Sequence, residues 1–167
     1  MRAKGRRRLR VLLLGIAITS LGIGGYFLSK SSLFDVDEIL VDGISGTLEE
    51  EVLNAADIAK GKPLLEVNTS TSAERVERIP WIKEARISRS FSGTVTIRVS
   101  VRDAVAAFQY ENGWIIVDID GRVLEKVETL PYSLLPIEGE IEDLSEGEWV
   151  SEQVIPSIEV AATISSE

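Results

Sequence analysis

The first 28 residues of the chain have a pattern of polar and apolar positions unlike that of the remainder. Residues 11–28 contain no charged side chain, and only Thr19, Ser20 and Tyr26 carry polar side-chain atoms there. A helix of this length would rise about 27 Å, close to the roughly 30 Å hydrocarbon core of a bilayer. The pattern predicts a transmembrane helix over residues 11–28, anchored by Val11, Leu12, Leu13, Leu14, Ile16, Leu21, Ile23, Phe27 and Leu28.

Basic residues precede this segment and predict its orientation. The residues before it include Arg6, Arg7, Arg8 and Arg10, whereas Lys30 is the one basic residue close behind it. Because cytoplasmic flanks hold the excess of Lys and Arg, we expect residues 1–10 to form a cytoplasmic tail and the rest to lie outside the cytoplasm. A cleaved signal peptide and a buried core helix are the alternatives, although the apolar region of a signal peptide is shorter.

From residue 33 the apolar spacing is that of a small mixed domain. Residues 34–41 predict a strand with a local bulge, which ends at the turn Asp42-Gly43. Two capping boxes follow, each opening a stretch of helical spacing, and the second stretch stops at Pro80. The boxes pair Thr47 with Glu50 and Thr71 with Glu74.

Alternating apolar positions then predict a hairpin. Residues 82–91 and 95–101 flank the turn Ser92-Gly93, and the second run alternates strictly. The order of strand, helix, helix, strand, strand predicts an α+β layer in which two helices cover one side of a three-stranded sheet. Trp81 opens the first strand of this hairpin, where we expect it to be partly buried in its own core.

The ordered series of these motifs resembles the POTRA domain of the bacterial cell-division family FtsQ/DivIB. The first part of the resemblance rests on Phe34, Val36, Ile39, Val41 and Gly43, followed by Gly61, Leu64, Leu65 and Val67. The second part rests on Ile79, Pro80, Trp81, Ile82, Ala85, Ile87 and Arg89, then Thr94, Val95, Ile97, Val99, Arg102, Val105 and Ala106. Val101 and Ala104 depart from the acidic residue and the proline that are usual in the family.

Beyond residue 106, turn signals separate three further apolar runs. Asn112-Gly113 and Asp120-Gly121 lie between residues 107–110, 114–119 and 123–127, which predicts a three-stranded meander. The region is also similar to the start of the family's second, β domain, through Trp114, Val117, Asp118, Gly121 and Val123, and then through Leu135, Pro136, Ile137 and Gly139. A helix is expected from about residue 156 to 164, and the C-terminus follows soon after.

This resemblance implies a domain order. It consists of the tail (1–10), the membrane helix (11–28), a POTRA domain (33–103) and an apparently incomplete antiparallel β domain (104–167). It also implies a non-enzymatic scaffold in the inner membrane at the division septum. Such a scaffold would bind FtsB and FtsL and help to regulate septal peptidoglycan synthesis by FtsW and FtsI.

Composition narrows the chemistry that this chain can perform. Seven of the 18 basic residues and none of the 27 acidic ones precede residue 33, so the part that follows is strongly acidic and would repel nucleic acid. The chain contains neither Cys nor His, which removes the thiolate nucleophile and the commonest general base. We therefore expect binding to proteins and to membrane lipid, with no catalysis, cofactor, metal or small-molecule substrate.

Several local features invite a sharper interpretation. Asp118, Asp120 and Gly121 resemble a fragment of a calcium loop, but the further ligands are missing and a hairpin turn explains them. Residues 138–148 are rich in acidic side chains, which is typical of a solvated loop. Unpaired strand edges could bind a partner strand, and the candidates are Val95, Ile97, Val99 and Val101, and Val123, Leu124 and Val127.

Two rival functions remain at this point. A membrane-anchored cell-wall hydrolase would need paired carboxylates beside a sugar cleft. A POTRA module of a protein-translocation system would usually be repeated along its chain. Neither rival has a distinctive motif in this sequence.

Overall fold

The computed structural model describes residues 2–29, 35–110, 113–137, 141 and 143–165. Within residues 2–11 and 27–29 it describes the backbone alone. Contacts divide the chain into two compact units. The first comprises residues 1–40, 58–68 and 88–96, and the second comprises residues 41–57, 69–87 and 97–167. Phe34 and Gly139, which belong to the family motifs, lie outside the described residues.

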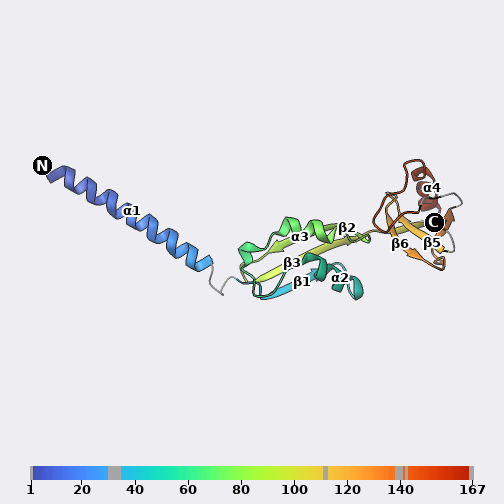
Figure 1. Ribbon diagram of the computed structural model, residues 1–167, viewed down its shortest axis with the longest axis horizontal. Helices are drawn as coiled ribbons and strands as arrows, with labels where there is room; N and C mark the ends of the chain where they lie inside the picture. Colours follow the sequence, from blue (N-terminus) through green and yellow to red (C-terminus); the bar gives the residue numbers. More distant parts are fainter. Residues whose placement is uncertain (1, 30–34, 111–112, 138–140, 142, 166–167) are drawn as a thin grey trace. The chain divides into compact units, whose positions relative to one another are not determined.

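Helix α1 (Arg2–Ser29) is continuous over 28 residues, longer than the predicted membrane segment (Figure 1). Its described large apolar side chains are all exposed: Leu12, Leu13, Leu14, Ile16, Ile18, Leu21, Ile23 and Tyr26. Over the described part of the chain, no helix combines the length and the apolar character that crossing a membrane requires. The side chains of Val11, Phe27 and Leu28 lie outside that part.

The predicted α+β combination of a three-stranded sheet and two helices is confirmed. Its sheet consists of β1 (Glu38–Asp42), β3 (Thr94–Val101) and β2 (Ile82–Arg89), in that spatial order. The helices α2 (Thr47–Ala56) and α3 (Thr69–Val76) lie alongside the strands, and the short 3₁₀ turn η2 (Leu64–Glu66) precedes α3 (Figure 1).

Alternation along β3 explains why this strand forms. Val95, Ile97 and Val99 are buried, while the side chains between them are at least partly exposed. Since successive side chains in a strand point to opposite faces, Val95, Ile97, Val99 and Val101 share one apolar face of β3. This face is buried as far as Val99, and Val101 at its end is exposed. Both helices likewise bury a stripe of small or β-branched residues, made up of Val52, Ala56, Ser72 and Val76.

The helix boundaries differ from those that the capping boxes predicted. Thr47 is the first helical residue of α2, and the N-cap is Gly46, which offers no side-chain hydrogen bond. Helix α2 ends at Ala56 because Asp57 adopts a left-handed conformation with φ 52°. Arg75 then donates from Nη2 to the carbonyl oxygen of Ala56 at 2.6 Å, so a side chain of α3 satisfies the end of α2.

The second sheet contains the predicted meander. Its strands are β4 (Ala104–Tyr110), β5 (Gly113–Asp118), β6 (Val123–Val127) and β7 (Leu135–Ile137), in the spatial order β6-β5-β4-β7. The three meander strands pair antiparallel, but β7 pairs parallel to β4, so the expectation of a purely antiparallel sheet was wrong. After β6, at one border of the sheet, the chain crosses to the opposite border and forms β7 there. Strand β7 runs in the same direction as β4 and β6.

Helix α4 (Ile155–Ser165) confirms the helix expected near the C-terminus. Its residues Ile158 and Ala161 belong to one buried apolar cluster with the sheet, whose other members are Ala106, Phe108, Ile115, Val117, Val123 and Val150. The helix therefore covers one face of the second sheet and completes its core.

Candidate functional site

The largest concentration of buried charge lies where β3 has ended and β5 turns into β6. Arg102 follows β3 directly, and its backbone N–H donates to the carbonyl of Trp81 at 2.9 Å. Its guanidinium donates from Nε to the carbonyl of Ile82 at 3.4 Å. Only 9% of the Arg102 side chain is exposed, so the charge must be compensated within the protein.

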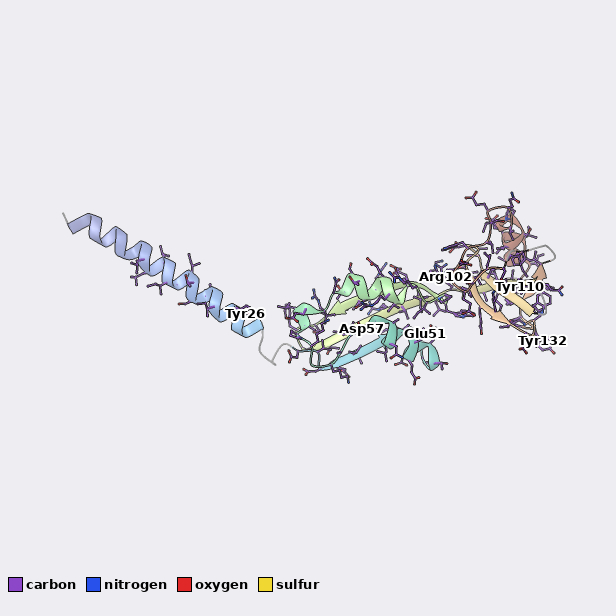
Figure 2. All side chains as sticks on the ribbon, viewed as in Figure 1. Tyr26, Glu51, Asp57, Arg102, Tyr110 and Tyr132 are labelled. Carbon is purple, nitrogen blue, oxygen red and sulfur yellow. The ribbon has the colours of Figure 1, made fainter. Side chains whose placement is uncertain are left out.

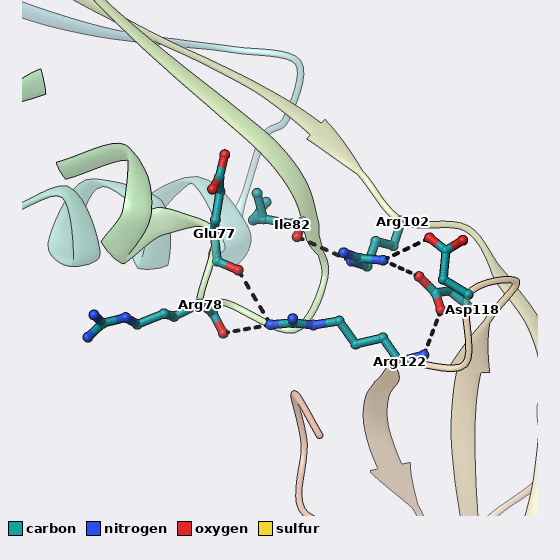
Figure 3. Close-up of polar contacts among 7 residues, drawn as sticks. Glu77, Arg78, Ile82, Arg102, Asp118 and Arg122 are labelled. Carbon is teal, nitrogen blue, oxygen red and sulfur yellow. Dashed lines mark hydrogen bonds and ion pairs between the residues drawn. The ribbon is translucent and has the colours of Figure 1, made fainter. Parts of the chain in front are cut away.

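Asp118 supplies that compensation. One carboxylate oxygen pairs with Nη1 of Arg102, and the other accepts a hydrogen bond from the backbone N–H of Arg122 at 2.7 Å (Figure 3). The Asp118 side chain is 3% exposed, which makes this a buried ion pair. Asp120, whose side chain is half exposed, adds a second carboxylate 3.3 Å from the same Arg102 nitrogen.

Arg122 extends the cluster toward the end of α3. Its Nη2 donates to the carbonyl oxygens of Glu77 and Arg78 at 3.4 and 3.3 Å (Figure 3). Burial, together with repulsion from Arg102, lowers the pKa of Arg122, while Asp118 acts in the opposite direction. An arginine remains protonated at any physiological pH, so the positive charge stays in place.

Trp149 completes this arginine cluster, which we define as Arg102, Asp118, Asp120, Arg122 and Trp149. The guanidinium carbons of Arg102 and Arg122 lie 5.4 and 5.5 Å from the centroid of the Trp149 ring. These distances are within the range of cation–π attraction. Half of the Trp149 surface remains exposed.

The carboxylates that resembled a fragment of a calcium loop are bound by arginines in this cluster. Both oxygens of Asp118 are used by arginines, and Asp120 faces the same guanidinium, so an arginine occupies the place that a cation would take. Among the described residues, no group of three or more acidic, His or Cys side chains could hold a metal ion. Arg102, a member of this cluster, is labelled in Figure 2. The cluster pairs its charges internally and so can fix the local structure.

One of the two predicted strand edges was wrong. Val95, Ile97, Val99 and Val101 belong to β3, which lies in the middle of its sheet. Both sides of β3 are therefore hydrogen-bonded, and the outer strands are β1 and β2. Strict alternation reveals which face of a strand is buried, but it does not reveal the position of a strand within a sheet.

The second predicted edge, β6 with Val123, Leu124 and Val127, does lie at the border of its sheet. Its outer side is partly covered by residues 145–150. Val123 donates to the carbonyl of Glu148 at 2.9 Å and accepts from Gly147 at 2.8 Å. The Glu146 carboxylate accepts the N–H of Lys126 at 3.3 Å.

The acidic run is thus more than a solvated loop. Asp143 forms an ion pair with Lys126 at 2.8 Å, and Glu148 accepts the backbone N–H of Ser145 at 2.6 Å. Hydrogen bonds from Lys126 and Tyr110 lower the pKa of the Asp143 carboxyl. The run therefore protects an edge that would otherwise be open to pairing.

The other predicted residues are not members of this cluster. Arg6, Arg7, Arg8 and Arg10 lie in the helical backbone of α1, but their side chains are outside the described part. Trp81 is partly buried, as expected, and so is Trp114 near the start of β5. The sequence offered a signal for Asp118 through the turn motif, and it offered none for the pairing with Arg102 or for Trp149.

Comparisons with known proteins agree with this architecture. Residues 34–102 match the protein family described as "POTRA domain, FtsQ-type". The chain is 34% identical to the cell division protein FtsQ of Mycolicibacterium smegmatis over 116 residues, which is 69% of this chain and 35% of that protein. FtsQ of Mycobacteroides abscessus is 32% identical over 68% of the chain and 37% of its own length. FtsQ of Caulobacter vibrioides is 27% identical over 70% of the chain and 38% of its own length.

The three-stranded sheet with its two helices, together with the family match, defines a protein with a POTRA domain of the FtsQ type. The chain matches little more than a third of the length of each of these relatives. It belongs to the FtsQ family of cell division proteins.

Proposed function

We propose that this chain is a membrane-anchored, non-enzymatic component of the bacterial division machinery, which acts by binding other division proteins outside the cytoplasm. The observation that carries the proposal is the match of residues 34–102 to the FtsQ-type POTRA domain, and the relatives named above are cell division proteins. By the same resemblance, its partners are FtsB and FtsL, and through them FtsW and FtsI at the septum.

The proposed anchor is the segment 11–28 within α1. Its support is the absence of any charged residue over this span and the exposure of every described large apolar side chain on the helix. Such a surface is unfavourable in water and favourable in lipid. Thr19 donates its hydroxyl to the carbonyl of Gly15 at 2.9 Å, so this polar group is satisfied within the helix.

The proposed orientation places residues 1–10 in the cytoplasm, because the basic residues gather there. Since the chain contains no cysteine, single-cysteine variants can report topology without background. Tyr132→Cys, at a fully exposed position labelled in Figure 2, should react with a membrane-impermeant maleimide on intact cells. Ala3→Cys should react only after lysis, and the reverse pattern would refute this orientation.

The division role is tested by following an N-terminal fluorescent fusion of the chain in dividing cells. The expected result is a band at midcell that depends on the POTRA domain. A matched control replaces residues 35–103 and leaves the membrane segment and the second sheet intact; it should give a uniform membrane signal. A uniform signal from the unaltered chain would overturn the proposal.

We propose β6 as one edge to which a partner strand can add. The support is its place at the border of the sheet, where the described residues cover its outer side only in part, through Asp143 and residues 145–150. Glu146→Ala frees the N–H of Lys126 and should strengthen capture of FtsB in a pull-down. Glu128→Ala, an exposed change just beyond β6, is the control and should leave capture unchanged.

A further inference from the structure

Phe91 and Leu65 are large apolar side chains of the first unit that lie in solvent, outside helix α1. Phe91 is 79% exposed and Leu65 is 59% exposed. With Leu64 and Arg89 they line an open cleft of about 130 Å³. We call Leu65, Arg89 and Phe91 the apolar tip. Single exposed apolar residues are common on protein surfaces, so the grouping of two beside a cleft is the feature that needs an explanation.

The backbone under this tip is held in place. Nη1 of Arg89 lies 3.2 Å from the carbonyl oxygens of both Leu64 and Val67, and 3.4 Å from that of Leu65. One guanidinium therefore fixes the turn η2, which buries Leu64 and leaves Leu65 outside. The turn that carries Phe91 is closed by Ser90, which donates to the carbonyl of Thr94 at 2.8 Å. Both apolar side chains are thus presented on fixed backbone.

The first described residues after α1 are hydrogen-bonded to the two segments that carry the tip, at residues close to Leu65 and Phe91. Val36 donates to the carbonyl of Lys62 at 2.9 Å, and Asp37 donates to the carbonyl of Gly93 at 2.8 Å. Helix α1 ends at Ser29, and the described chain resumes at Asp35. Six residues span at most about 20–22 Å even when fully extended. The apolar tip therefore cannot lie far from the end of α1.

We propose that the apolar tip docks on the bilayer surface, with Phe91 and Leu65 in the interfacial layer of the outer leaflet. The inference rests on the proposed membrane anchor, because the short tether then holds the tip beside the headgroups. The interfacial region is about 5–8 Å thick on each side of the hydrocarbon core. Aromatic side chains are enriched at that depth, and long basic side chains reach lipid phosphates from it.

The charges around the tip indicate what kind of lipid contact this is. The segments 58–68 and 88–96 carry Lys60, Lys62 and Arg89 against Glu66 alone. The adjoining residues 35–38 add three carboxylates, so the surface as a whole is close to neutral. Docking is therefore driven by apolar contact and depends little on anionic lipid, in contrast to polybasic attachment.

The test uses the full chain reconstituted into phosphatidylcholine vesicles, with a single nitroxide-labelled cysteine. Phe91→Cys and Leu65→Cys should show higher accessibility to oxygen than to a water-soluble paramagnetic reagent. Tyr132→Cys is the matched aqueous control, and Leu14→Cys is the control inside the proposed anchor. The ratio of the two accessibilities at Phe91 should lie between those of the two controls and should not change when phosphatidylglycerol is added.

The outcomes separate this inference from the proposal on which it rests. A label at Phe91 as water-exposed as that at Tyr132, with the label at Leu14 in lipid, overturns the docking but leaves the anchor intact. A label at Leu14 in water overturns both. Lipid contact at Phe91 that requires added partner proteins overturns the docking as well, because the tip then binds a protein.

A second variant tests the contribution of the side chains themselves. A label at Ser92→Cys in the Leu65→Ser/Phe91→Ser background should lose its lipid contact several-fold, compared with Ser92→Cys alone. The thermal midpoint of the double variant should stay that of the unaltered chain, since both side chains are exposed. Retained lipid contact in the double variant would contradict the inference.

Discussion

Apolar side chains are usually buried and charged ones exposed, and two regions of this molecule depart from that rule. The apolar tip exposes apolar side chains, whereas the arginine cluster buries charged ones. At the tip, Phe91 and Leu65 lie in solvent on backbone that a guanidinium holds in place. In the cluster, the guanidinium of Arg102 and the carboxylate of Asp118 are buried together. The comparison shows that arginine serves two tasks here. In one region it fixes a turn that presents apolar surface, and in the other it neutralises a buried carboxylate.

The largest expected effect comes from breaking the buried ion pair. Asp118→Ala leaves the Arg102 charge without its main partner and should lower the free energy of unfolding by about 3–5 kcal/mol. Urea unfolding in detergent micelles, followed by tryptophan fluorescence, measures the loss. Asp120→Ala removes only a half-exposed carboxylate and should cost no more than about 1 kcal/mol.

A double variant sharpens the same point. Arg102→Met with Asp118→Leu replaces both charges by apolar groups, which should recover most of the loss seen in Asp118→Ala. Equal losses in the single and double variants would show that packing around these residues, and not the unpaired charge, accounts for the effect.

The two phenylalanines offer a matched test of burial. Phe108 is 2% exposed in the core of the second sheet, whereas Phe91 is 79% exposed. Phe108→Ala should destabilise the protein by about 3–5 kcal/mol, since it removes buried apolar surface and leaves a cavity. Phe91→Ala should change stability by no more than about 0.5 kcal/mol. A large loss at Phe91 would mean that its side chain supports the fold and is not a free surface.

Two glycines with nearly equal backbone angles test packing separately from strain. Gly121 and Gly61 have φ values of 82° and 80°. A Cβ at Gly61 would meet nothing within 4 Å, whereas a Cβ at Gly121 would collide with the side chains of Ile155 and Val150. Gly61→Ala should cost about 1–2 kcal/mol from strain alone. Gly121→Ala should cost about 1–3 kcal/mol more because of the overpacking.

The smallest expected effect concerns the acidic segment that covers β6. Hydrogen bonds from Lys126 and Tyr110 lower the pKa of Asp143 below its ordinary value of 3.8. A carboxyl with a lowered pKa stabilises the folded state above that ordinary value and loses this contribution as the pH falls through the lowered pKa. In Lys126→Ala, the pKa of Asp143 should rise toward 3.8, which an NMR titration of the carboxyl would detect.

How much the sequence could predict depends on the range of each interaction. The apolar alternation of residues 95–101 identified β3 and its buried face, and the turn residues Asp120-Gly121 identified the meander, because both signals are local. The capping box misplaced the start of α2 by one residue, because Gly46 and not Thr47 is the N-cap. At the other end of α2, Arg75 of α3 donates to the carbonyl of Ala56, a long-range contact that no local pattern reveals.

By itself, the sequence determined the uncharged N-terminal segment, the α+β order of elements and the family motifs, since each depends on residue spacing along the chain. The tertiary structure alone decided that β3 is a central strand, that β7 runs parallel to β4, and that Arg102 meets Asp118 across a separation of 16 residues. Strand order and buried ion pairs are set by which surfaces the chain brings together on folding. A periodic pattern of apolar residues is equally compatible with several such arrangements.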